Sequence, residues 1–223
     1  MTKLIVGNWK QNKTLIDVES WLLQFEGLIK DIALGDTEVV ICPPAPYLTQ
    51  VSEFSGKYEG IHAGVQDVSE YVEGQHTGEI SAQQDADFAN FCIVGHSERG
   101  ESRELALKKA KNCMLVGLVP IVCFVNGEEL KLFDGLEAFY LWEDPATISK
   151  EGEFVPKSAD AIADGIKQIK KEYNTGLGLL YGGSVNRNNV SDLAKIKELD
   201  GIVSGSASLD ANHFFELISA FIQ

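Results

Sequence analysis

Residues 91–99 read Phe-Cys-Ile-Val-Gly-His-Ser-Glu-Arg, so an apolar run gives way to a polar one directly after a glycine. The apolar run is too short for a helix and is typical of a strand buried on both faces. Helical spacing of apolar residues starts near Glu101 and continues towards Cys113. The stretch therefore predicts a strand that ends just before His96, close to the start of a helix.

His96 is the first candidate functional residue, because it lies at this predicted junction of strand and helix. The amino end of a helix carries partial positive charge, which favours the neutral form of a nearby imidazole. A neutral imidazole can donate a hydrogen bond to a substrate carbonyl. A lone histidine in this place more often caps the turn, so the assignment depends on the rest of the chain.

The composition limits the classes of partner. The chain has 223 residues, 44% of them hydrophobic, and a net charge of −14. This length suffices for one α/β barrel or for two smaller domains. Nucleic acids and anionic membranes are bound through clustered Lys and Arg, so the acidic balance argues against both as partners. An anionic substrate would need a local positive field made by lysines and backbone amides.

The cysteines indicate a cellular compartment. None of the four has the paired spacing of a zinc site or a redox motif, and most lie in apolar runs: Cys42, Cys92, Cys113 and Cys123. Reduced, buried thiols are the simplest interpretation. The amino-terminal apolar run is too short for a signal peptide, and no segment has the length of a membrane span. We therefore expect a cytoplasmic protein.

Short apolar runs alternate with amphipathic stretches along the chain. The expected strands are 4–6, 39–42, 60–65, 91–94, 120–125, 138–142, 178–181 and 201–203. The expected helices are 15–29, 46–54, 79–88, 101–115, 158–173, 189–196 and 211–221, with only a turn or two in 127–136. Eight such units predict an α/β fold, a single-domain (β/α)₈ barrel over residues 1–223. An open doubly wound sheet is the alternative, but the sequence lacks its glycine-rich fingerprint.

Polar residues follow several of the predicted strands. In a (β/α)₈ barrel the carboxyl ends of all strands meet at one face, so these residues should share one site. Asn8 and Lys10 follow the first strand, and Glu143 closes the sixth. Lys10 is suited to neutralising negative charge, and Glu143 is a candidate general base. The charged residues after His96 are interpreted as a supporting ion network: Glu98, Arg99 and Glu101.

The last two strands end in glycine–serine sequences. Gly-Gly-Ser at 182–184 follows the seventh strand, and Ser-Gly-Ser at 204–206 follows the eighth. Glycines let the backbone approach an anion closely, and serine hydroxyls can donate to it. The loops after strands seven and eight are the usual phosphate site of such barrels. Either sequence alone could be a simple turn, but the two together favour a phosphate site.

Five motifs, in this order, resemble those of the triosephosphate isomerase family. They are Gly-Asn-Trp-Lys-Gln-Asn (7–12), Thr-Gly-Glu-Ile-Ser (77–81), Val-Gly-His-Ser-Glu-Arg (94–99), Tyr-Gly-Gly-Ser-Val (181–185) and Asp-Gly-Ile-Val-Ser-Gly-Ser-Ala-Ser-Leu (200–209). The resemblance implies a TIM barrel that acts in glycolysis and gluconeogenesis. It also implies interconversion of dihydroxyacetone phosphate and D-glyceraldehyde 3-phosphate through an enediolate, without cofactor or metal.

The resemblance implies a role for each candidate residue by its position. Asn8 and Lys10 would hold the substrate, His96 would be the electrophile, and Glu143 would be the base. The substrate phosphate would be held by Ser184, Gly205, Ser206 and Ser149, and Glu98 would support the site. In the family the loop that corresponds to 67–77 reaches into a neighbouring subunit, which implies a homodimer or a homotetramer.

Two segments depart from the usual pattern of the family. The proline that normally follows the catalytic Glu is displaced to Pro145, and glycines at the tip of the lid become Ser149 and Glu151. Several residues that usually follow Arg99 are missing, which makes the chain short for the family. The altered lid leaves two alternatives open: a barrel that acts on another sugar phosphate, or one that binds phosphate without catalysis.

Overall fold

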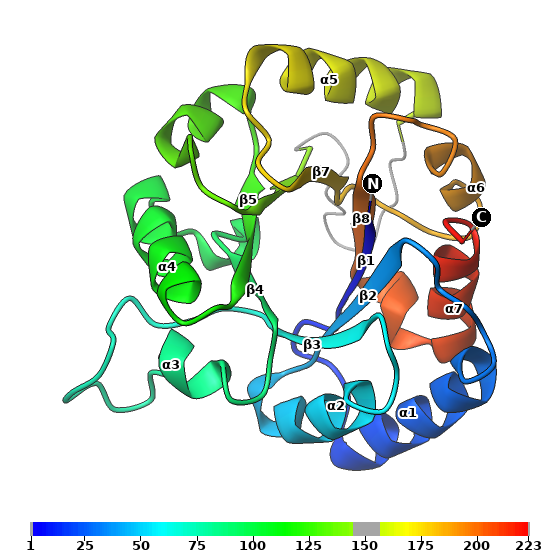
Figure 1. Ribbon diagram of the computed structural model, residues 1–223, viewed down its shortest axis with the longest axis horizontal. Helices are drawn as coiled ribbons and strands as arrows, with labels where there is room; N and C mark the ends of the chain where they lie inside the picture. Colours follow the sequence, from blue (N-terminus) through cyan, green and yellow to red (C-terminus); the bar gives the residue numbers. More distant parts are fainter. Residues whose placement is uncertain (1, 145–156, 223) are drawn as a thin grey trace.

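The computed structural model describes residues 2–144 and 157–222. Its eight parallel strands form a closed barrel in which neighbours follow chain order and the last strand returns to the first (Figure 1). The strands are β1 (Lys3–Asn8), β2 (Thr37–Cys42), β3 (Ile61–Val65), β4 (Phe91–Val94), β5 (Val119–Phe124), β6 (Phe139–Trp142), β7 (Gly178–Tyr181) and β8 (Gly201–Ser204). The predicted (β/α)₈ barrel is confirmed, and the open sheet was wrong.

Helices surround the barrel on all sides (Figure 1). The α-helices are α1 (Leu15–Ile29), α2 (Leu48–Ser55), α3 (Ala82–Asp85), α4 (Arg103–Leu115), α5 (Ala159–Glu172), α6 (Val190–Leu193) and α7 (Ala211–Ser219). The 3₁₀ helices are η1 (Ala45–Tyr47), η2 (Ser97–Arg99), η3 (Gly127–Phe133) and η4 (Ser206–Leu209). Segments 79–88 and 189–196 form shorter α-helices than predicted. Among the described residues, no helix is long and apolar enough to cross a membrane.

The helix after β4 begins later than the sequence predicted. His96 is followed by the single 3₁₀ turn of η2, which ends at Gly100 in a left-handed conformation with φ +61°. Ser102 then caps α4, because its hydroxyl accepts a hydrogen bond from the amide of Leu105 at 3.2 Å. His96 therefore precedes a short 3₁₀ turn rather than the amino end of a long α-helix.

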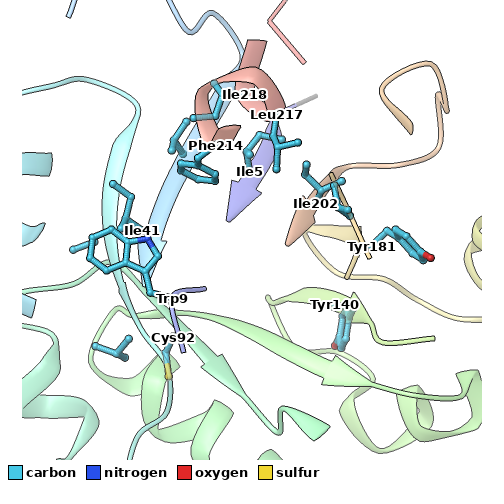
Figure 2. Packing of buried hydrophobic residues seen from close by; sticks show 14 of the residues in the cluster. Ile5, Trp9, Ile41, Cys92, Tyr140, Tyr181, Ile202, Phe214, Leu217 and Ile218 are labelled. Atoms are coloured by element: carbon cyan, nitrogen blue, oxygen red, sulfur yellow. The ribbon is translucent and has the colours of Figure 1, made fainter. Parts of the chain in front are cut away.

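Strand side chains alternate between two apolar layers. One layer fills the barrel interior and includes Leu4, Val6 and Ile93. The other lies between the strands and the helices, where Ile5 packs near Phe214 of α7 (Figure 2). Burial on both faces explains why the strands read as continuous apolar runs. All four cysteines are buried and unpaired, as the sequence predicted.

The seam between β1 and β8 closes the barrel. Leu4 of β1 is the register partner of Gly201 of β8. A Cβ atom at position 201 would lie 1.9 Å from the carbonyl oxygen of Leu4, and Gly201 has a φ of +154°. Because this contact is with backbone, no side-chain rotation can relieve it. Glycine is therefore required at this position for closure.

Replacing Gly201 with alanine should destabilise the fold by about 3 kcal/mol or more, because the added methyl group forces the two strands apart. Urea unfolding measures this change. Gly27→Ala is the matched control: its added Cβ meets nothing within 4 Å in α1, so we expect stabilisation of about 0.5–1 kcal/mol. Equal stability of the two variants would contradict the closure argument.

Candidate active site

A cavity of about 600 Å³ lies at the carboxyl ends of the strands. Among the residues that line it are the predicted ones Asn8, Lys10, His96, Glu98, Glu143, Ser184, Gly205 and Ser206. They come from the ends of β1, β4, β6, β7 and β8 and from the loops that follow. The remaining predicted residue, Ser149, lies outside the described residues, as do Pro145 and Glu151.

Glu143 is a buried carboxylate that accepts hydrogen bonds from Ser97. Its side chain is only 6% exposed. Ser97 donates to it twice, from the backbone amide at 2.9 Å and from the hydroxyl at 2.8 Å. Sequence reasoning did not select Ser97 as a site residue. Its place directly after His96, in the same polar motif, is the signal that could have identified it.

His96 is neutral, and hydrogen bonding determines which nitrogen carries its proton. The ring Nδ1 accepts a hydrogen bond from the backbone amide of Glu98 at 3.2 Å, which leaves the proton on Nε2. Burial lowers the pKa of His96 and the charge of Lys10 adds to this, whereas the carboxylates of Glu143 and Glu98 oppose it. The predicted neutral form is therefore supported, with burial as its main cause.

The imidazole and the buried carboxylate are neighbours. Nε2 of His96 lies 3.4 Å from Oε1 of Glu143. The backbone just before His96 is held at both its polar groups, since the amide of Gly95 donates to Glu101 at 3.0 Å and its carbonyl accepts from Arg103 at 3.1 Å. Gly95 also has a left-handed φ of +72°. These contacts fix the direction in which the imidazole enters the cavity.

Lys10 brings a positive charge to the same cavity. Its backbone is in the left-handed region, with φ +51°, and its amide donates to the side chain of Asn8 at 3.0 Å. The ammonium contacts Oε1 of Glu98 at 2.5 Å. Strained backbone of this kind is common at functional sites, where the surrounding structure holds it. A Cβ at Gly205 would lie 3.3 Å from Cε of Lys10, so a glycine there leaves room for the lysine stem.

The charged residues after His96 only partly form the predicted network: Asp67 and Lys109 join Arg99 to Glu101, whereas Glu98 pairs separately. Glu98 pairs with Lys10. Burial raises the pKa of Glu98, but the hydrogen bond and charge of Lys10 outweigh this effect and the net pKa is lowered. Arg99 contacts Asp67 at 2.7 Å. Glu101 turns inward and pairs with a buried lysine, Lys109, at 2.7 Å. Of the three, only Glu98 lines the cavity.

The loops after β7 and β8 are fixed by hydrogen bonds of their own. Ser184 has a left-handed φ of +46°. Its carbonyl accepts from the side chains of Asn186 at 3.2 Å and Asn189 at 3.0 Å. Ser208 donates its hydroxyl to the carbonyl of Gly205 at 2.6 Å. The glycine–serine sequences thus form rigid walls of the cavity beside Lys10.

The fold and the site define a class of protein: a (β/α)₈ barrel with a polar cavity built from the carboxyl ends of its strands. A family profile described as triosephosphate isomerase matches residues 3–139 and 142–221. The chain belongs to the triosephosphate isomerase family.

Bacterial relatives support this over nearly their full lengths. A triosephosphate isomerase of Hahella chejuensis is 32% identical over 249 residues, with 99% of each chain covered. One of Thermus thermophilus is 30% identical, with 96% of this chain and 97% of the relative covered. One of Ehrlichia chaffeensis is 31% identical, with 98% and 96% covered.

We expect ¹⁵N NMR of protein with ¹⁵N-labelled histidine to show that His96 is protonated at Nε2 and unprotonated at Nδ1. Its titration should give a pKa below the ordinary 6.5, because burial disfavours the imidazolium. The signals that are lost in a His96→Gln variant are those of His96. A proton on Nδ1, or a pKa above the ordinary value, would contradict this description of the site.

Proposed function

We propose that this chain interconverts dihydroxyacetone phosphate and D-glyceraldehyde 3-phosphate, with Glu143 as the base and His96 and Lys10 as the stabilising groups. The observation that carries the proposal is the position of a carboxylate, a neutral imidazole and an ammonium around one cavity. Membership of the triosephosphate isomerase family supports the same reaction.

The reaction moves a proton between two carbons that lie next to each other. Glu143 takes a proton from the hydroxyl-bearing carbon, and the electrons of that C–H bond form a carbon–carbon double bond. The carbonyl electrons move onto oxygen, where the N–H of His96 and the ammonium of Lys10 stabilise the developing negative charge. Glu143 then returns the proton to the former carbonyl carbon. The hydroxyl proton of the other oxygen passes, by way of His96, to the former carbonyl oxygen, so that one oxygen becomes the new carbonyl and the other the new hydroxyl. The cycle balances without an oxidant or reductant.

Ser97 occupies the carboxylate oxygens of Glu143 that the proton transfer requires. Ser97 donates one hydrogen bond to each oxygen of the carboxylate. Glu143 therefore has to exchange Ser97 for the substrate carbon before it can accept a proton.

The phosphate of the substrate would lie against the loops after β7 and β8. Ser184, Gly205 and Ser206 line that wall of the cavity, and the Lys10 ammonium is near enough to Gly205 to add charge. We propose Ser149 as a further phosphate ligand. Glu98 would hold Lys10 in place through their ion pair. The net charge of −14 makes this local positive field essential for attracting an anion.

We propose that the chain is cytoplasmic and works as a homodimer or homotetramer. The loop of residues 66–81 between β3 and α3 extends away from the barrel (Figure 1). It carries three exposed apolar side chains: Tyr71 is 41% exposed, Val72 61% and Ile80 41%. Phe88, just after α3, is 44% exposed. Apolar side chains gathered on a protruding loop are typical of a protein interface.

Replacing Glu143 with glutamine should lower the turnover number by about a thousandfold, because the amide cannot accept the carbon-bound proton. Binding of inorganic phosphate should change by less than about threefold, since the loops after β7 and β8 are untouched. Steady-state kinetics with D-glyceraldehyde 3-phosphate and phosphate inhibition measure the two effects.

The wild-type protein provides the reference for this experiment, with methylglyoxal formation followed in the same reaction. Rapid isomerisation with little methylglyoxal is the expected result, because a closed site protects the enediolate from loss of phosphate. Near-normal turnover by Glu143→Gln would show that another group is the base. A wild type that binds phosphate but turns over no triose phosphate would overturn the proposed reaction.

Sedimentation of the wild type should show a dimer or tetramer, and Val72→Glu should shift it towards the monomer by burying a charge in the interface. Ile16→Glu is the matched control, because Ile16 is an equally apolar, 77% exposed side chain on α1. That variant should keep the wild-type mass. A monomeric wild type at micromolar concentration would contradict the proposal.

A further inference from the structure

Lys13 has a backbone conformation that does not suit its side chain. Its φ is +76°, in the left-handed region that favours glycine. It lies three residues after Lys10 in the loop between β1 and α1. Unlike Lys10, it is not one of the described residues that line the cavity. A lysine held in such a conformation needs compensating contacts of its side chain.

The side chain of Lys13 makes those contacts with a different part of the barrel. Its ammonium donates a hydrogen bond of 2.7 Å to the carbonyl of Leu209, the last residue of η4. The same ammonium lies 5.0 Å from the ring centroid of Trp9 and 5.8 Å from that of Trp21. Both rings are buried, so these contacts of cation and aromatic ring are partly shielded from water.

The tryptophans connect the same two segments. The indole N–H of Trp21, on α1, donates to the carbonyl of Ser208 in η4 at 3.1 Å. Trp9 packs edge-on against Trp21, with ring centroids 4.9 Å apart. Lys13 and Trp21 therefore hold adjacent carbonyls at the carboxyl end of η4.

The other end of η4 forms part of the cavity. Ser206 begins this short helix, and Gly205 just before it approaches Cε of Lys10 so closely that a Cβ would be 3.3 Å away. The spacing between the Lys10 ammonium and the amino end of η4 thus depends on how the β1–α1 loop is attached to η4. Lys13 lies at that attachment.

We infer that Lys13 is a positioning residue that ties the loop carrying Lys10 to η4. It thereby sets the distance between the Lys10 ammonium and the start of η4 at Gly205 and Ser206, which together bind the phosphate of the substrate. This inference rests on the proposed function, because it assigns the phosphate to Gly205, Ser206 and Lys10. Lys13 itself does not touch the substrate. Its effect should therefore appear in substrate binding and not in the proton transfer.

The test is Lys13→Gly, which relieves the left-handed backbone and removes the ammonium. We expect KM for D-glyceraldehyde 3-phosphate and Kd for inorganic phosphate each to rise about tenfold, the effect of losing one hydrogen bond made by a charged group. The turnover number should stay within about threefold of the wild type. The fall in the urea midpoint should be small compared with the loss of phosphate affinity, because glycine adopts this left-handed backbone without strain.

Three further variants separate the possible causes. Lys13→Arg keeps the cation and should restore most of the phosphate affinity. Trp21→Phe keeps a ring but removes the hydrogen bond to Ser208, so it should weaken phosphate binding in the same direction. Lys30→Met is the charge control: this exposed residue caps the carboxyl end of α1, and its loss should leave KM unchanged.

The inference is overturned if Lys13→Gly keeps the wild-type KM and phosphate Kd, or if only the turnover number falls. An equal effect of Lys30→Met would also overturn it, since long-range attraction would then explain the change. Failure of the proposed reaction is distinguishable, because it appears as an inactive wild type. In that case phosphate binding by the same variants still decides the role of Lys13.

Discussion

Closure of a parallel barrel is the constraint on which the rest of the structure depends. Each strand pairs with the next in chain order, and Gly201 lets β8 meet β1 at backbone contact. A parallel barrel places all carboxyl ends at one rim. Residues as distant in sequence as Asn8, His96, Glu143 and Ser206 therefore share one cavity.

Strained backbone conformations and a buried charge occur around that cavity. Lys10, Ser184 and Lys13 are the chain's non-glycine residues with positive φ among those described, and each lies in a loop after a strand or beside the site. The buried carboxylate of Glu143 is satisfied by Ser97, and the imidazole of His96 is kept neutral by burial. Backbone geometry and hydrogen bonds thus fix much of the site in advance, whereas Glu143 has to exchange Ser97 for the substrate.

Much of this could be predicted because the relevant signals are local. Apolar runs located every strand, since a strand that is mostly buried on both faces has few polar positions to interrupt it. Helices were located less well: α3 and α6 are single turns, shorter than apolar spacing alone predicted. The start of α4 was misplaced because Gly100 and Ser102 decide it through φ and capping.

The sequence by itself determined the barrel, its strand order and the identity of the polar residues at the strand ends, because periodicity and motifs are properties of neighbouring residues. Only the tertiary structure decided that Ser97 holds Glu143, that burial keeps His96 neutral, that Glu98 pairs with Lys10, and that Lys13 reaches Leu209. The physical reason is distance in sequence. Such contacts depend on side-chain direction and burial, which exist only after the barrel has closed.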